Sequence, residues 1–133
     1  MFEKFNFSPR QINNYFNAAS RDLKIASDSV IPEVIFKFSY DGLIKLAVAV
    51  CAKNGLRVKA RAGHHIELLE KLSKFIGSKD VESVGNEMRR KRNLDLYGGG
   101  VLISEKEARE YIKWLKEIFI KAEIYFLGAN KLL

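Results

Sequence analysis

The segment Pro32–Gly55, PEVIFKFSYDGLIKLAVAVCAKNG, is apolar on nearly every side when it is wound into a helix. Pro32 suits the first helical position, where its missing N–H would have no intrahelical partner, and Gly55 suits the position after the last turn. The apolar side chains are spread around the helix: Val34, Ile35, Phe36, Phe38, Leu43, Ile44, Leu46, Val48 and Val50. A helix without a polar face is expected in the centre of a bundle, with other helices around it. A kink is easiest at Asp41 and Gly42, in the middle of the segment.

Four more helices are predicted around this central one. The first covers residues 9–28, because Ser8 can cap it and apolar residues follow at helical spacing. The others are expected at about 63–76, from about 80 to the glycines at 98–100, and from 104 to about 127, where Ser104 and Glu107 form an S-x-x-E capping box. In residues 53–65, Arg57, Lys59 and Arg61 alternate with small or apolar residues, as in a short strand. Since no other part of the chain offers a partner strand, an extended loop is predicted. Five helices predict an all-α, up-and-down bundle, and 133 residues fit a single domain over residues 1–133.

The composition is that of a basic globular chain. Hydrophobic residues make up 47% of it, and 23 Lys and Arg against 16 Asp and Glu give a net charge of +7, which favours polyanionic partners. The one cysteine, Cys51, lies in an apolar run, so we expect a buried thiol and no intramolecular disulfide. The longest apolar run, 46–52, is too short to cross a bilayer, and the N-terminus lacks the apolar region of a secretory signal. We therefore expect a cytoplasmic protein with no membrane segment, and no metal or other cofactor.

Residues 88–100, MRRKRNLDLYGGG, close the fourth helix with a polar stripe. Residues three or four apart share a helix face, and four side chains here do so: Arg89, Arg92, Asn93 and Tyr97. Arg90 and Lys91 are expected to point to solvent. Because the stripe adjoins the apolar face of the helix, we expect Arg92 and Asn93 to be partly buried.

A partly buried Arg92 requires a partner, since an unpaired buried charge is costly. One explanation is structural: Arg92 pairs with a carboxylate such as Asp95 or Glu87, and Asn93 bonds a loop carbonyl. The other is functional: the stripe lines a cleft, in which the planar guanidinium and the Tyr97 hydroxyl bind a phosphate-sized anion. The spacing alone does not choose between them.

The run RRKRNLDLY, residues 89–97, resembles the signature of the HEPN superfamily of small helical domains. The usual HEPN motif is an arginine, commonly followed by a polar residue such as asparagine, and then a histidine a few residues later. Arg92 and Asn93 match the start of this motif, and Tyr97 stands where the histidine would fall. The chain is also similar to HEPN domains in size, in its succession of helices and in the position of the motif near the end of the fourth helix.

The resemblance implies a homodimer in which two motif-bearing helices face each other across a shared cleft. In active HEPN domains the arginine and histidine of both chains cleave RNA without a metal. Many other members look like inactive binding or assembly modules, and several belong to toxin–antitoxin systems with a small nucleotidyltransferase. The candidate catalytic residues that carry over are Arg92 as anion ligand and Asn93 as orienting residue. Tyr97, with a reference pKa of about 10, is a poor general base and is better suited to hydrogen bonding or stacking.

We therefore expect a dimeric domain that binds RNA or a nucleotide in a basic cleft. Two alternatives remain. One is an active, metal-independent endoribonuclease, in which Arg92 binds the scissile phosphate and Tyr97 or a nearby histidine moves protons. The other is a non-enzymatic module that binds a nucleotidyltransferase.

A second basic element precedes the third helix. This element contributes five candidate nucleic-acid-binding residues: Arg57, Lys59, Arg61, His64 and His65. The fourth helix contributes three more, Arg89, Arg90 and Lys91. The plainer expectation for the adjacent histidines is structural, and a helix N-terminus disfavours a protonated imidazole. If residues 57–65 fold against the fourth helix, the two basic elements form one positive surface for nucleic acid.

Overall fold

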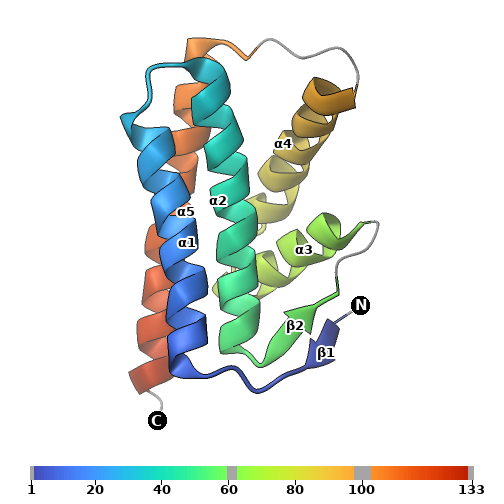
Figure 1. The fold of residues 1–133 in the computed structure, drawn as a ribbon, viewed down its shortest axis with the longest axis vertical. Coiled ribbons are helices and arrows are strands. Elements are labelled where there is room, and N and C mark those ends of the chain that lie inside the picture. The colour runs from blue at the N-terminus through green and yellow to red at the C-terminus, as the bar shows by residue number, and fades with distance from the viewer. Residues whose placement is uncertain (1, 60–62, 98–102, 132–133) are drawn as a thin grey trace.

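The computed structural model describes residues 2–59, 63–97 and 103–131, and the side chains of all of these except 95–97 and 129–131. Its elements, in chain order, are β1 (Phe2–Lys4), α1 (Pro9–Asp28), α2 (Pro32–Lys53), β2 (Leu56–Val58), α3 (His64–Ile76), α4 (Asp80–Tyr97) and α5 (Glu105–Lys131). α1, α2 and α5 lie along the long axis of the molecule, and α3 and α4 lie on the other flank of α2 (Figure 1). The predicted all-α bundle of five helices is confirmed for the described residues, with a two-stranded sheet added to it.

α2 is the central helix, as its apolar sequence predicts. Of its 22 residues, 13 are buried, and it packs against each of the other four helices. It runs unbroken through Asp41 and Gly42, so the kink expected there does not occur. Gly42 is buried against α1, where a Cβ would make an ordinary contact, 3.4 Å from the Cβ of Asp22. Apolar as it is, α2 falls short of what a membrane-spanning helix needs, and so do the other helices within the described ranges.

The segment after α2 is a strand, and the prediction of an extended loop was wrong. β2 pairs antiparallel with β1, with Phe2 opposite Val58 and Lys4 opposite Leu56. Each strand has three residues, which is too short for an alternating pattern to mark it. The partner strand comes from the first residues of the chain, so only the folded structure brings the two together. The sheet lies near the end of the molecule at which α2 ends (Figure 1).

α3 and α4 form a helical pair that carries most of the predicted site. α3 ends at Gly77, whose φ of 67° lies in the left-handed region that glycine adopts without strain. α4 then returns along α3, and Leu69 of α3 shares the core with Val81 and Met88 of α4. Gly85 permits this close packing, because a Cβ there would lie 2.7 Å from Leu69 Cδ2. The position of α4 therefore depends on the absence of a side chain at residue 85.

Polar side chains hold α4 on its other flank, against α5. The contacts are a hydrogen bond of 2.9 Å from Trp114 Nε1 to Asp80 Oδ2, a hydrogen bond from the Tyr111 hydroxyl to Glu87, and a bond of 2.8 Å from Lys91 Nζ to Glu107 Oε2. α4 is thus fixed by apolar packing on α3 and by hydrogen bonds to α5.

Candidate functional site

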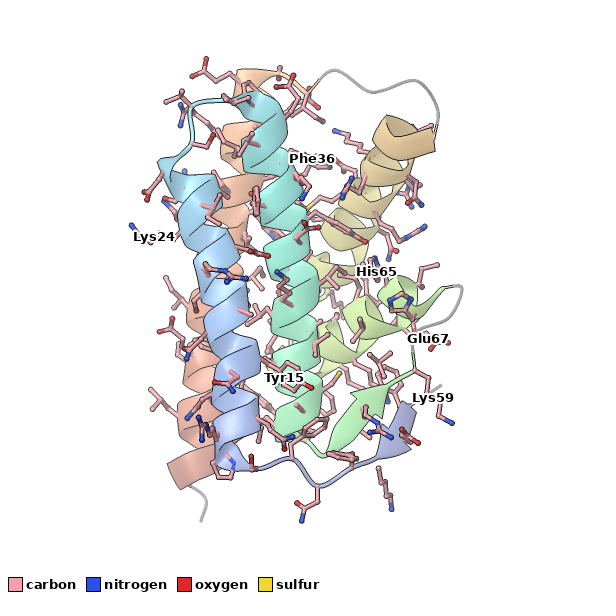
Figure 2. All side chains as sticks on the ribbon, viewed as in Figure 1. Tyr15, Lys24, Phe36, Lys59, His65 and Glu67 are labelled. Atoms are coloured by element: carbon pink, nitrogen blue, oxygen red, sulfur yellow. The ribbon has the colours of Figure 1, made fainter. Side chains whose placement is uncertain are left out.

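His65, at the first turn of α3, is tied to the central helix by a hydrogen bond. The Tyr40 hydroxyl and His65 Nδ1 lie 2.8 Å apart, and the centroids of the two rings are 5.7 Å apart. Tyr40 comes from the middle of α2 and is 2% exposed. His65 is half-buried, and Figure 2 labels it on α3. The His64 ring stands edge-on to His65, with 4.4 Å between the centroids. The bond to Tyr40 therefore fixes the orientation of one imidazole against the core.

The surroundings of His65 lower its pKa from the ordinary value. Burial is the main cause, and it is reinforced by His64; Asp41 opposes the shift, while Arg89 and Arg92 add to it. Arg89 and Arg92 act on His65 through their charges, and no hydrogen bond joins them to it among the described side chains. The lowered pKa favours the neutral form of this imidazole near pH 7.

Arg89 and Arg92 form no ion pair with a carboxylate among the described side chains. Their positive charges are therefore not neutralised on this face of α4. Both are half-buried, and both counteract the burial that raises the pKa of Tyr40. Arg89 Nε donates to Asn86 Oδ1 at 3.0 Å. Within the described residues, the side chain of Arg92 forms neither a hydrogen bond nor an ion pair. Two neighbouring, partly buried cations of this kind form a favourable place for an anion.

Of the two carboxylates considered as partners of Arg92, Glu87 is engaged elsewhere. It accepts the hydrogen bond of the Tyr111 hydroxyl and lies 3.6 Å from Lys91 Nζ. The side chain of Asp95 lies outside the described residues. The described part of the structure therefore supplies no acid that neutralises Arg92.

The expected burial of the α4 stripe holds for Arg92 but was wrong for Asn93, which is exposed. The inward line of α4 runs from Val81 through Met88 to Arg92, at intervals that keep one helix face. Asn93 is one residue further, about 100° around the helix, and so faces solvent. Tyr97 is the last residue of α4, and its side chain lies outside the described residues.

Lys91 was expected to point to solvent, but it joins α4 to α5. Its side chain is 24% exposed, and its ammonium group lies 2.8 Å from Glu107 Oε2 and 5.0 Å from the centre of the Tyr111 ring. Burial alone would lower the pKa of Lys91, but the bonds to Glu107 and Tyr111 outweigh it and raise that pKa above its ordinary value. The charge run of α4 is therefore divided: Lys91 is structural, whereas Arg90 is exposed.

Arg57 and Lys59 are engaged with the β1 strand. Glu3 forms ion pairs with both, at 3.9 Å in the case of Lys59, and the hydrogen bond from Arg57 lowers the pKa of Glu3. The guanidinium of Arg57 also stacks over the Phe5 ring, 4.4 Å from its centre. The candidate Arg61 lies outside the described residues. Of the second basic element, the structure thus brings His65 to the arginines of α4, while Arg57 and Lys59 support the sheet.

Tyr40 is the site residue that sequence analysis did not single out. A tyrosine within an apolar helix is expected to be an ordinary core residue. Its partner His65 is 25 residues away, so no local pattern connects the two. The available signal was its hydroxyl, since a buried tyrosine needs a hydrogen-bonding partner. The adjacent Asp41, where the sequence suggested a kink, instead forms an ion pair of 3.4 Å with Lys37.

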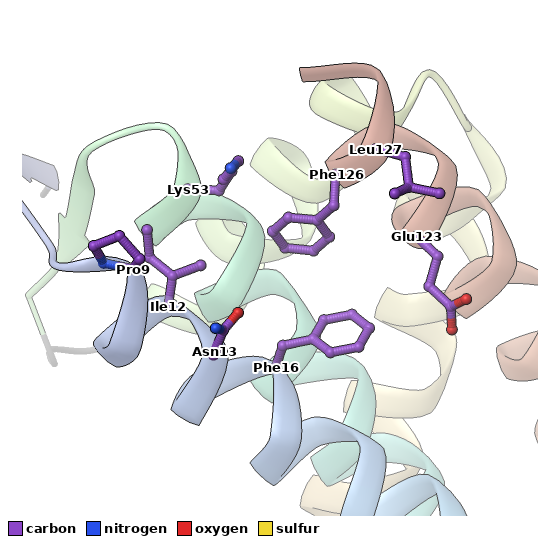
Figure 3. Close-up of a pocket in the computed structure, with 8 residues that line it drawn as sticks. All are labelled: Pro9, Ile12, Asn13, Phe16, Lys53, Glu123, Phe126 and Leu127. Carbon is purple, nitrogen blue, oxygen red and sulfur yellow. The ribbon is translucent and has the colours of Figure 1, made fainter. Parts of the chain in front are cut away.

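A hollow of about 840 Å³ lies elsewhere, between α1 and α5 (Figure 3). It is lined by Pro9, Ile12, Asn13, Phe16, Lys53, Glu123, Phe126 and Leu127. Smaller hollows lie beside the sheet and around Arg90, and Arg92 and His65 line none of the three. We still take the Arg92–His65 cluster as the candidate site, because cations and a titratable group meet there, whereas the walls between α1 and α5 are mostly apolar.

Metal and thiol chemistry have no support in the described residues. There, no three His, Cys, Asp or Glu side chains come together in a way that could hold a metal ion. Cys51 is 1% exposed, and burial raises the pKa of its thiol to about 12, so it is not a nucleophile near neutral pH.

Comparison of the chain with protein-family models, with curated proteins and with solved structures found no match. The HEPN resemblance therefore rests on the sequence alone, namely on the motif around Arg92 and on the size and helical succession of the chain.

Proposed function

We propose that this chain is a HEPN-like domain that binds a phosphate group of RNA or of a nucleotide at Arg89 and Arg92. The observation that carries the proposal is the charge of α4: two half-buried guanidinium groups lie one turn apart, with no carboxylate bound to them among the described side chains. A phosphate oxygen would relieve the repulsion between them and would accept their N–H groups in the planar geometry that arginine offers.

The overall charge supports a polyanion as the ligand. The net charge of +7 attracts nucleic acid from a distance, and the exposed Arg90 and Asn93 on α4 add donors beside the site. Phosphate contacts of this kind fix position on a strand without reading sequence. The expected binding is therefore strongly dependent on salt and weakly dependent on base sequence.

The proposal includes a homodimer. The resemblance implies that a second copy would place its own motif-bearing helix opposite Arg89 and Arg92. Leu94, on the same helix as Arg92, is 53% exposed, which suits a side chain that is covered by a second copy. A toxin–antitoxin setting belongs to the same proposal and rests on the resemblance alone, whereas a cytoplasmic location is proposed from the sequence features given above.

A second candidate function is that of a module that binds a nucleotidyltransferase. One feature favours a protein partner: three large apolar side chains on α5 are more than half exposed and follow helical spacing, namely Ile120, Ile124 and Leu127. This stripe lies on a different helix from Arg92, so the two functions can be separated by substitution.

Fluorescence anisotropy with a labelled single-stranded RNA tests the main proposal. We expect Arg92→Gln to weaken binding at least about tenfold, because a hydrogen bond to a charged group contributes about 1.5–3 kcal/mol. Arg21→Gln, on the exposed face of α1, removes the same charge away from the site and should weaken binding about twofold or less through screened long-range attraction. Equal losses in the two variants, or no RNA binding by the wild type, would refute the proposed site.

A further inference from the structure

We infer that the hollow between α1 and α5 binds an amphipathic small molecule, whose single carboxylate lies at Lys53 and whose apolar tail lies along Phe16 and Phe126. This inference goes beyond the proposed function, because none of the residues that line the hollow is among the proposed RNA-binding residues. The volume of about 840 Å³ falls within the range of about 300–1,000 Å³ that is usual for small-molecule sites.

The middle of the hollow is an aromatic surface that suits a hydrocarbon tail. The rings of Phe16 on α1 and Phe126 on α5 meet edge to face, with 5.2 Å between their centroids, and both are partly buried against the core. Ile12 adds apolar surface at one end of the hollow, and Leu127, which is 59% exposed, does so at the other (Figure 3). An apolar tail placed here removes its own surface and that of the walls from water.

One end of the hollow is suited to an anionic head group. Lys53, from the last turn of α2, lies at this end together with Pro9 and Asn13 of α1 (Figure 3). α1 begins at Pro9 and has no acidic residue in its first turn, so no carboxylate of that turn offsets the positive end of the helix dipole. The exposed Asn13 amide is a further donor. An ammonium group has three N–H donors, so Lys53 can bind a carboxylate in addition to its contacts within the chain.

The opposite end carries a negative charge, which restricts the class of ligand. Glu123 of α5 lies there beside Leu127, is exposed, and forms no ion pair among the described side chains (Figure 3). A ligand carboxylate at this end would be repelled, whereas one at Lys53 would be attracted. The two ends therefore fix the direction of the ligand, and they favour a molecule with one carboxylate over a molecule with one at each end.

Isothermal titration calorimetry of the full chain with dodecanoate, below the concentration at which it forms micelles, tests the inference. We expect the wild type to bind one molecule per chain, with affinity falling roughly twofold to fourfold for each methylene removed from the tail. Dodecylamine, which lacks the carboxylate, and dodecanedioate, which adds a second one, should each bind at least about tenfold more weakly. These comparisons need only the wild type, so they do not depend on the folding of any variant.

Two charge variants locate the head group. Lys53→Gln should weaken dodecanoate binding at least about tenfold, whereas Lys116→Gln, which removes the same charge from the exposed face of α5, should change it about twofold or less. Glu123→Gln should reduce the preference for dodecanoate over dodecanedioate at least about threefold, because the repulsion at the far end is gone. Circular dichroism checks that each variant is folded.

A matched pair on α5 locates the tail. Leu127→Ser should weaken binding at least about threefold, because Leu127 lines the hollow. Ile124→Ser is the control, since Ile124 is 63% exposed on the same helix but does not line the hollow, and it should leave the affinity unchanged. Equal losses in these two variants would mean that the ligand adsorbs to the exposed apolar face of α5, and would overturn the inference.

The remaining outcomes separate this inference from the proposed function. No saturable binding of dodecanoate, or equal affinity for dodecanoate and dodecylamine, overturns the inference and leaves the RNA site untouched. Dodecanoate should not change the affinity of the wild type for RNA, because the hollow and the arginines of α4 lie on different helices. Failure of the chain to bind RNA would remove the proposed function and leave the carboxylate site standing.

Discussion

Replacing Gly85 with alanine should destabilise the protein, although alanine is the better helix former. A Cβ at residue 85 would lie 2.7 Å from Leu69 Cδ2 and 3.1 Å from Leu69 Cδ1. Leu69 is 0% exposed, so its methyl groups cannot move out into solvent. Overpacking of this kind costs about 1–3 kcal/mol, and the helix propensity of alanine over glycine offsets about 1 kcal/mol of it. We expect a net loss of about 1 kcal/mol in the free energy of unfolding.

Gly42→Ala is the matched control. Its Cβ would lie 3.4 Å from the Cβ of Asp22, which is an ordinary contact, so the gain in helix propensity should keep the protein as stable as the wild type or up to about 1 kcal/mol more stable. Urea unfolding followed by far-UV circular dichroism measures both variants. The reasoning is refuted if Gly85→Ala is at least as stable as Gly42→Ala.

A double-mutant cycle locates the effect. In a Leu69→Ala background the obstructing methyl groups are gone, so Gly85→Ala should become neutral or stabilising, with a coupling of about 1 kcal/mol or more. Additive costs would mean that residues 69 and 85 do not touch. Because this contact sets α4 against α3, Gly85→Ala should also weaken RNA binding, whereas Gly42→Ala should not.

Three further predictions concern other contacts. Lys91→Met should lower the free energy of unfolding by about 1 kcal/mol in urea, since it leaves Glu107 unpaired, while RNA affinity falls no more than in Arg21→Gln. Because folding lowers the pKa of His65, the unfolded chain binds its proton more readily. The contribution of His65 to stability is complete above pH about 6.5 and is lost as pH falls through the folded pKa. The free energy of unfolding of the wild type should therefore fall more steeply than that of His65→Asn as pH is lowered from about 6.5. Leu94→Glu should convert a dimer into a monomer by analytical ultracentrifugation with no loss of helix content, whereas Ile124→Glu on α5 should leave the α4-mediated dimer intact.

The helices were predictable from local signals that the structure reproduces. Ser8 caps α1 by accepting a hydrogen bond from Gln11 N, and Ser104 and Glu107 exchange the two bonds of a capping box at the start of α5. Gly77 ends α3 in the left-handed conformation. Such signals involve residues at most a few positions apart, so a sequence displays them directly.

The contacts that define the candidate site were not predictable in the same way. The bond between Tyr40 and His65 spans 25 residues and depends on how α3 crosses α2. The charge run of α4 looks uniform in the sequence, yet Lys91 is taken by Glu107 because α5 places an acid opposite it. The pairing of β1 with β2 joins strands that only the whole fold brings together. In each case the deciding partner lies on another element.

The most direct test of the account is an NMR titration of the His65 imidazole with and without the single-stranded RNA of the binding assay. The account predicts that the bound phosphate raises the pKa of His65, because an anion then faces the ring together with Arg89 and Arg92. It further predicts that the effect is lost in Arg92→Gln. A protein that binds the RNA while the pKa of His65 stays unchanged would contradict a single site built from α2, α3 and α4.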